Sequence, residues 1–236
     1  MGILAKFWKN LARRQPITAY AKNKVMHGEI PIGTLSREKV HSYWKDDVNL
    51  LTNPNNPEGY RNESHRSEFL YEQIKSLNVT HDDTILEIGC NIGRNLNYLY
   101  QQGFHNLHGI EINPHAILLM KKYYPEMASH STILVGSVED KIKEIKEKQM
   151  LVTFSMAVLE HIHPTSDFIF AEMSRITSHY LMTIELENSY TPKVYPRDYG
   201  KIFTALGWNM ILNKPVDKSD LASSGYIIRI FSRKVL

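Results

Sequence analysis

A ten-residue stretch combines an acidic side chain, a tight turn and the start of a helix. It reads Leu86-Glu87-Ile88-Gly89-Cys90-Asn91-Ile92-Gly93-Arg94-Asn95. Glycine at such a turn lets the backbone approach a ligand closely. A dinucleotide site would require G-x-G-x-x-G, which places a pyrophosphate on the helix N-terminus. Here an acid precedes the first glycine, and it would repel a pyrophosphate. The stretch therefore suits a cationic ligand that carries an ammonium and a sulfonium.

A second acid strengthens this interpretation. Glu111 ends the next predicted strand, 22 positions after Gly89. An acid at that place can accept hydrogen bonds from both hydroxyls of a ribose. Together with Glu87, Gly89 and Gly93, it predicts a nucleoside-containing ligand at the carboxyl edge of a parallel sheet.

Short apolar strands alternate with helices from residue 64 onwards, which predicts a parallel sheet covered on both faces. The predicted strands are 84–88, 107–112, 132–135, 151–155, 180–186, 208–212 and 225–232. The predicted helices are 64–77, 92–102, 114–124, 138–148, 165–176 and 196–206. Asn113 as N-cap and Pro114 in the first turn begin the helix at 114. The fold class is thus α/β, a Rossmann-like, seven-stranded, mostly parallel sheet.

The N-terminal quarter differs from this regular pattern. Residues 1–24 carry six basic and no acidic side chains, which leaves 22 basic and 25 acidic residues in the remainder. The mildly acidic body shows no whole-domain nucleic-acid footprint, so DNA is not expected as a partner, and the basic arm keeps RNA as a minor alternative. The arm could instead pack on the domain, form a homodimer or lie on an anionic membrane.

Residues 27–62 are rich in Gly, Pro and Asn, with a short helix near 39–45. Tyr43, Trp44 and Tyr60 in this segment could form a lid or a small core that fixes the arm. We therefore expect two parts, an extension over 1–62 with a basic arm and a lid-like segment, and a ligand-binding domain over 63–236.

Composition excludes several classes of protein. The chain has 236 residues and no apolar run near the roughly 20 needed to span a bilayer. Cys90 is the single cysteine, so an intrachain disulfide and a zinc site of several thiolates are excluded. No histidine pair stands at ligand spacing with carboxylates, and no metal site is predicted. A reducing, cytoplasmic compartment is expected, with a membrane-peripheral location as the alternative.

Residues 66 to 212 resemble a class I S-adenosylmethionine-dependent methyltransferase, most closely the small-molecule branch often labelled type 11 or type 12. The pattern E/D-x-G-x-G-x-G is present from Glu87 to Gly93, with Asn91 in place of the middle glycine. Asparagine adopts left-handed geometry more readily than most residues. The resemblance implies S-adenosylmethionine as cofactor and S-adenosylhomocysteine as product.

The resemblance also implies the cofactor contacts. The ribose-binding acid matches Glu111, and the segment beside the adenine matches 136–139, where Ser137 replaces the usual Asp. Arg66 could pair with the cofactor carboxylate or form a surface ion pair. The full predicted set is Arg66, Glu87, Gly89, Cys90, Asn91, Gly93, Asn95, Glu111, Ile112, Ser137, Val138, Glu139, Met156 and Ala157.

The residues around the acceptor leave alternatives open. His161 follows the fourth strand and could take a proton from an acceptor hydroxyl, or only brace the turn. Glu185 could bind a cationic or polyhydroxyl acceptor or be a solvated loop acid. Arg197 could hold a phosphate or carboxylate, or be an ordinary charge at a helix start. Tyr43 and Tyr199 complete the predicted acceptor contacts.

We therefore expect methyl transfer to an O or N atom of a small polar acceptor, such as a sugar or a phosphorylated precursor of a surface glycan or secondary metabolite. An RNA or protein methyltransferase is an alternative, although residues 155–158 lack the D/N-P-P-Y/F pattern of amino-methylating nucleic-acid enzymes. A non-catalytic cofactor-binding protein and a nicotinamide oxidoreductase are further alternatives. The intact acidic and glycine positions disfavour the former, and the missing third glycine disfavours the latter.

Overall fold

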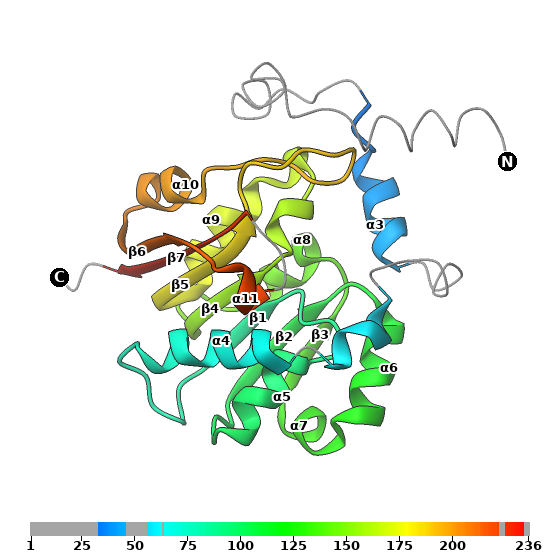
Figure 1. Cartoon of the computed structure of the whole chain (residues 1–236), viewed down its shortest axis with the longest axis vertical. Helices are drawn as coiled ribbons and strands as arrows, with labels where there is room; N and C mark the ends of the chain where they lie inside the picture. Colours follow the sequence, from blue (N-terminus) through cyan, green and yellow to red (C-terminus); the bar gives the residue numbers. More distant parts are fainter. Residues whose placement is uncertain (1–32, 46–55, 63, 222–224, 234–236) are drawn as a thin grey trace, which may run out of the picture.

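The structure, a computed structural model, describes residues 33–45, 56–62, 64–221 and 225–233. Its centre is a seven-stranded sheet in the order β3-β2-β1-β4-β5-β7-β6 (Figure 1). The strands are β1 (Ile85–Ile88), β2 (Leu107–Glu111), β3 (Thr132–Val135), β4 (Met150–Met156), β5 (Thr177–Leu186), β6 (Trp208–Pro215) and β7 (Tyr226–Arg233). Strands β1 to β5 are parallel, and β7 runs antiparallel to both β5 and β6. The predicted mostly parallel, Rossmann-like sheet is confirmed.

Helices cover both faces of this sheet. The helical elements are α3 (Arg37–Lys45), η1 (Pro57–Asn62), α4 (Ser64–Lys75), α5 (Arg94–Gln101), α6 (Pro114–Tyr123), α7 (Pro125–His130), α8 (Val138–Lys141), η2 (Ile142–Glu144), η3 (Leu159–His161), η4 (Pro164–Ser166), α9 (Phe168–Ile176), α10 (Tyr199–Ala205) and α11 (Lys218–Leu221). One apolar layer combines α4 to α7 and α11 with the sheet, and the other combines α8 to α10 with it.

The two layers follow from the alternation of side chains along each strand. In β1, Ile85 faces the layer that contains α4 and α5, whereas Leu86 and Ile88 face the layer that contains α8 and α9. Glu87 therefore points to the α5 side, where Asn95 meets it. Register places Ile88 beside Ile110 and Ser155, so β1, β2 and β4 end at one edge.

Most predicted elements are present, with differences where tertiary contacts decide. Asn113 caps α6 by accepting a hydrogen bond from the backbone N–H of His115, as predicted. The predicted helix over 138–148 begins where predicted but is too long, because regular α-helix ends at Lys141 and a 3-10 turn ends at Glu144. The guanidinium of Arg175 donates hydrogen bonds to the carbonyls of Ile142 and Ile145, and these bonds cap the end of the helical turn. The short helices α7 and α11 were not predicted.

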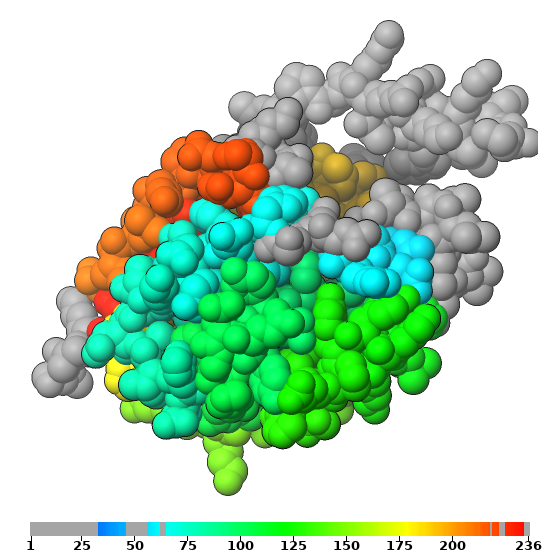
Figure 2. Space-filling view, turned by 60° about the horizontal axis from the view of Figure 1, so that its bottom comes forward, coloured from blue at the N-terminus to red at the C-terminus, as the bar shows by residue number. Residues whose placement is uncertain are grey.

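The described part of the N-terminal extension lies against the domain. Figure 2 shows the η1 segment and α4 in cyan beside the green helices α5 to α7. The Tyr123 hydroxyl donates to the Glu58 carboxylate at 2.7 Å, which ties η1 to α6. The predictions for residues 1–24 fall outside the described residues. In the described ranges, no helix combines the length and apolar character needed to cross a bilayer.

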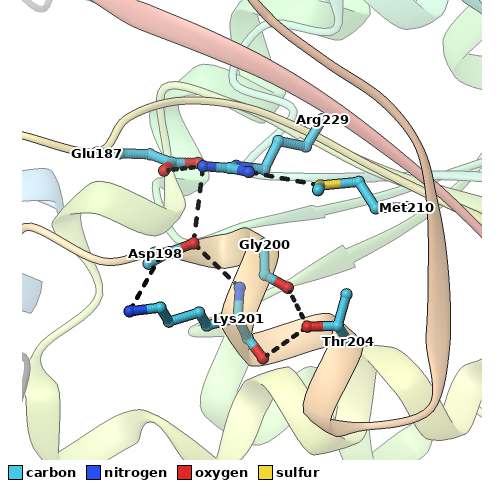
Figure 3. A network of polar contacts seen from close by, with 7 residues as sticks. All are labelled: Glu187, Asp198, Gly200, Lys201, Thr204, Met210 and Arg229. Carbon is cyan, nitrogen blue, oxygen red and sulfur yellow. Dashed lines mark hydrogen bonds and ion pairs between the residues drawn. The ribbon is translucent and has the colours of Figure 1, made fainter.

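A polar network joins strand β7, the last in the sequence, to Glu187 after β5 and to Asp198 before α10 (Figure 3). Arg229 on β7 makes two hydrogen bonds to the Glu187 carboxylate, at 2.6 and 2.7 Å. Asp198 at the start of α10 approaches the same guanidinium at 3.6 Å. A Cβ added to Gly200 would lie 2.5 Å from an Arg229 nitrogen, so a side chain at this position would displace the guanidinium. Both partners of the main pair are nearly buried, with 11% and 5% exposed side chains.

Substitution Arg229→Met should lower the free energy of unfolding by about 3–5 kcal/mol, because it deprives the buried Glu187 carboxylate of its guanidinium. Denaturant unfolding of the variant and the parent measures this. Lys75→Met is the matched control, since Lys75 and Glu72 form a pair that is 61% and 55% exposed, and should cost about 0.5 kcal/mol or less. Equal costs for the two variants would contradict the assigned role of Arg229.

Candidate functional site

The turn after β1 has the left-handed backbone that its residues permit. Gly89, Asn91 and Gly93 have φ of 72°, 49° and 76°. The backbone N–H groups of Gly89 and Cys90 both donate to the Ile110 carbonyl, which fixes the turn on β2. A Cβ at Gly89 would lie 2.5 Å from Val158, so this glycine also permits the close approach of the turn that follows β4. Asn91 occupies the left-handed position expected of it.

Glu111 joins this turn to the end of β2. One carboxylate oxygen accepts from the N–H of Asn91 and the other from the N–H of Asn113, both at 2.8 Å. Burial raises the pKa of this carboxyl, and the backbone N–H donors oppose the rise. Each oxygen keeps further lone-pair capacity toward the cavity that Glu111 lines. That capacity fits a pair of ribose hydroxyls.

Glu87 is held in the same region by α5. Its Oε1 accepts from the Asn95 side chain at 2.6 Å, while its Oε2 is buried without a hydrogen-bond partner among the described residues. Burial raises the pKa of Glu87 to about 8. A cation placed at Oε2 would offset that desolvation, so this site fits the ammonium of an amino-acid group.

These groups meet in one cavity of about 410 Å³ at the carboxyl edge of the sheet. Its size is that of a small-molecule or cofactor site. The predicted cofactor residues that line it are Arg66, Glu87, Gly89, Cys90, Asn91, Asn95, Glu111, Ile112, Val138, Glu139, Met156 and Ala157.

Gly93 and Ser137, which were also predicted to bind the cofactor, do not line the cavity. Gly93 caps α5, and its backbone packs against Met120 and Met127. The Ser137 hydroxyl donates to Asp140 at 2.7 Å.

His161 lines the cavity and has a defined orientation. Its Nδ1 lies 2.9 Å from the Lys193 carbonyl, which can only accept, so Nδ1 carries the proton and Nε2 is the basic nitrogen. The Trp44 ring packs on the imidazole with centroids 4.6 Å apart. Burial lowers the pKa of His161 to about 4, and the Lys193 carbonyl opposes that change. The imidazole is therefore neutral near pH 7.

Two buried carboxyls, those of Glu160 and Glu185, lie near His161. Glu185 accepts from the N–H groups of Val158 and Glu160, which holds the turn after β4. Glu160 accepts from the N–H of Leu186 at 2.6 Å, and its other oxygen lies 3.6 Å from His161 Nε2. Burial, followed by the charge of Glu185, raises the pKa of Glu160 to about 8. Burial raises the pKa of Glu185 to about 7.

The structure corrects the predicted acceptor contacts. Glu185 is fully buried under the turn after β4, Tyr199 is fully buried in the core beside Phe170, and neither lines the cavity. Arg197 is also buried, and its guanidinium donates to the carbonyls of Leu159 and Ile162 and to Asp167. Tyr43 lies outside the cavity, with the Lys193 ammonium 3.3 Å from its ring centroid. All four side chains therefore contact other parts of the protein around the cavity and do not line it.

Several lining residues were not predicted. His41 on α3 bonds to Glu139 at 3.0 Å, and Arg94 donates to Ser67 and to the Tyr60 carbonyl. His163 also lines the cavity, and its Nδ1 accepts from the Thr165 N–H at the start of η4.

Tyr226 is a further lining residue that the sequence did not reveal. It begins β7 and pairs with Leu186 at the end of β5. An antiparallel strand brings its first residue to the edge where parallel strands end. The antiparallel insertion of β7 between β5 and β6 gave no sequence signal, so Tyr226 was missed.

Comparisons with known proteins agree with this geometry. A family model described as a methyltransferase domain matches residues 86–179. No curated protein sequence matches the chain.

Among solved structures, geranyl diphosphate C-methyltransferase from Streptomyces coelicolor A3(2) is similar, with 13% identity and a TM-score of 0.62, over 84% of this chain and 98% of that one. Magnesium protoporphyrin IX methyltransferase from Synechocystis PCC 6803 gives 11% identity and a TM-score of 0.62, over 84% of this chain and 100% of that one. The [4+2]-cyclase SpnF gives 10% identity and a TM-score of 0.60, over 72% and 81%.

The fold and the matched domain define the class of the protein. It carries the class I methyltransferase fold. Residues 86–179 match a methyltransferase domain, the class of domain whose cofactor is S-adenosylmethionine. The similarity to a cyclase shows that the fold alone does not define the reaction.

The buried carboxyls predict that stability falls as pH rises. Their folded pKa values of about 8, 7 and 8 for Glu87, Glu185 and Glu160 exceed the unfolded value of about 4.3. The folded state thus holds protons that the unfolded state has lost, and stability declines between about pH 4.5 and 8 and levels off above that range. Denaturant unfolding across this range measures the decline.

Glu160→Gln should flatten the decline, because the amide still accepts from Leu186 N–H and does not ionise. Glu147→Gln, whose parent side chain is 67% exposed, is the control and should keep the parent slope. Stability that stays constant or increases over this pH range would contradict the buried neutral carboxyls.

Proposed function

We propose that the protein transfers a methyl group to an oxygen, or a nitrogen, of a small polar acceptor enclosed beside His161, such as a sugar or a phosphorylated precursor. The observation that carries this proposal is the cavity shared by the predicted cofactor residues, His161 and helix α3. Residues 63–236 form the cofactor-binding domain in this proposal. Residues 1–62 form an extension, and its described part, through α3 and η1, covers the cavity.

The donor groups in the cavity fit S-adenosylmethionine. Glu87 would hold the ammonium and Glu111 the ribose hydroxyls. Glu139, held by His41, would border the adenine, and Arg66 would pair with the carboxylate. When bound, the cofactor supplies an electrophilic methyl group on a sulfonium. Met156 and Ala157, at and just after the end of β4, would border that group.

His161 is suited to accept the acceptor proton. Its Nδ1–H is held by the Lys193 carbonyl, so Nε2 offers a lone pair. The Glu160 carboxyl, 3.6 Å from Nε2, is mostly protonated at pH 7 because its pKa is about 8, and it would stabilise an imidazolium only after losing that proton. The remaining acceleration would come from positioning the acceptor oxygen and excluding water beneath α3.

No carboxylate is left for a cationic acceptor among the described residues on the His161 side. Glu160 and Glu185 bind backbone N–H groups, and Glu187 binds Arg229. The polar side chains that line the cavity include Arg66, Tyr226 and the histidines 161 and 163, and its lining acids Glu87, Glu111 and Glu139 are those assigned to the cofactor above. This set favours an acceptor that is neutral or anionic, and supports oxygen over nitrogen as the methylated atom.

Calorimetric titration with S-adenosylhomocysteine tests the cofactor assignment. At pH 7 Glu87, with its pKa of about 8, is mostly protonated, so pairing with the ammonium should release close to one proton, about 0.9. The measured enthalpy should then vary with the ionisation enthalpy of the buffer. Glu87→Gln should release no proton and bind roughly 10- to 150-fold more weakly, the scale of a bond to a charged group.

5′-Methylthioadenosine, which lacks the amino-acid half, is the ligand control and should bind without proton release. Proton-free binding of S-adenosylhomocysteine, unchanged in Glu87→Gln, would contradict the assignment of Glu87. Absent binding, or a preference for NADH or NADPH, would overturn the cofactor site as a whole.

Methyl-labelled S-adenosylmethionine, offered with a panel of sugars, sugar phosphates and amines, tests the acceptor class. We expect labelled products from hydroxyl acceptors, and a rate reduced by about 10²- to 10⁴-fold in His161→Gln. Affinity for S-adenosylhomocysteine should stay within about twofold, since the base contacts the acceptor. His105→Gln, at an exposed histidine far from the cavity lining, is the control. Equal rates in His161→Gln would remove the base assignment, and labelling confined to amines would assign nitrogen instead.

A further inference from the structure

Helix α3 is bound at both ends to the loop that follows β5. At its N-terminal side, the Leu35 N–H donates to the Pro192 carbonyl at 2.9 Å, and the Thr34 hydroxyl lies 2.8 Å from the Tyr190 hydroxyl. In the middle, Val40 is buried against Tyr195. The face of α3 formed by residues 40, 41 and 44 lines the cavity.

The C-terminal turn of α3 depends on a different contact. The Lys193 ammonium lies 3.3 Å from the Tyr43 ring centroid and 5.8 Å from that of Trp44. An ammonium over an aromatic face is attracted by the electrons of the ring. Trp44, next in sequence, then packs on His161. Lys193 is therefore in contact with α3 through its side chain and with His161 through its carbonyl.

We propose that Tyr43 is a positioning residue for the proposed reaction, because it holds the last turn of α3 on Lys193 and thereby keeps Trp44 packed on the basic imidazole. The proposal rests on the proposed function of His161. It implies that the reactive state forms only when α3 is packed against the loop after β5. It also implies that an acceptor must be small enough to be enclosed beneath α3. Tyr43, expected to touch the acceptor, acts instead through Trp44 and Lys193.

The packing of α3 on His161 can be measured without any acceptor or cofactor. The charged and titratable groups around the His161 ring are the Glu160 carboxyl on η3 and the Lys193 ammonium on the loop after β5. Burial lowers the pKa of His161 to about 4. Loss of Trp44 from the ring would admit water and move this pKa up toward the ordinary value of about 6.5.

The experiment is a pH titration of the His161 ring by proton NMR in the full chain, with the resonance assigned by its loss in His161→Gln. Tyr43→Ala should raise the His161 pKa by more than about one unit. Lys193 keeps its charge in this variant, so the rise would report lost packing. Tyr43→Phe keeps the ring and should titrate as the parent does.

Ser42→Ala, at an exposed position on the same helix, is the matched control and should leave the titration unchanged. An unchanged His161 pKa in Tyr43→Ala would overturn the proposal, and so would a Tyr43→Phe variant that behaves like Tyr43→Ala. Because no methyl group is transferred in this experiment, its failure is distinct from a failure of the proposed function. If the acceptor panel yields a product, Tyr43→Ala should also lower its rate of formation, and Tyr43→Phe should restore it.

Discussion

The burial of acidic side chains at one edge of the sheet is the constraint on which the rest of the structure depends. Six glutamates are buried in the described chain, and they lie in the parallel strands or within the four residues that follow one: Glu87, Glu111, Glu139, Glu160, Glu185 and Glu187. Taking a carboxylate from water costs several kcal/mol unless hydrogen bonds or a cation replace the lost hydration. Each of the six therefore dictates what must be placed beside it.

The buried acids fall into two groups according to what replaces their lost hydration. One group belongs to the structural framework and the other to the candidate site. Glu185 and Glu187 are satisfied by the protein itself, the first by backbone N–H groups of the turn after β4 and the second by Arg229. Glu87 is left with an oxygen that has no partner in the described chain, and Glu111 has lone-pair capacity facing the cavity. The framework acids thus fix the turns, and the incompletely satisfied acids define where a ligand fits.

The extension completes the same site from outside the sheet. Helix α3 supplies His41 to Glu139 and Trp44 to His161, so the proposed cofactor side and the proposed acceptor side of the cavity both contact one short helix. Its own burial is modest, with Val40 as its one buried side chain. Its placement therefore depends on a few specific contacts with the loop after β5, in contrast to the extensive apolar layers that hold α4 and α9.

The sequence by itself determined the alternating α/β order, the glycine turn after β1 and the acids at Glu87 and Glu111, because local backbone preference and strand periodicity act over a few neighbouring residues. Even there, the helix over 138–148 was overestimated, since the Arg175 side chain, distant in sequence, takes its carbonyls. Only the tertiary structure decided that Arg197 and Glu185 face inward and that Tyr226 and His41 face the cavity. Those outcomes depend on hydrogen-bond partners 25 to 98 positions away in the sequence. A local sequence pattern does not indicate which distant residue a buried side chain will contact.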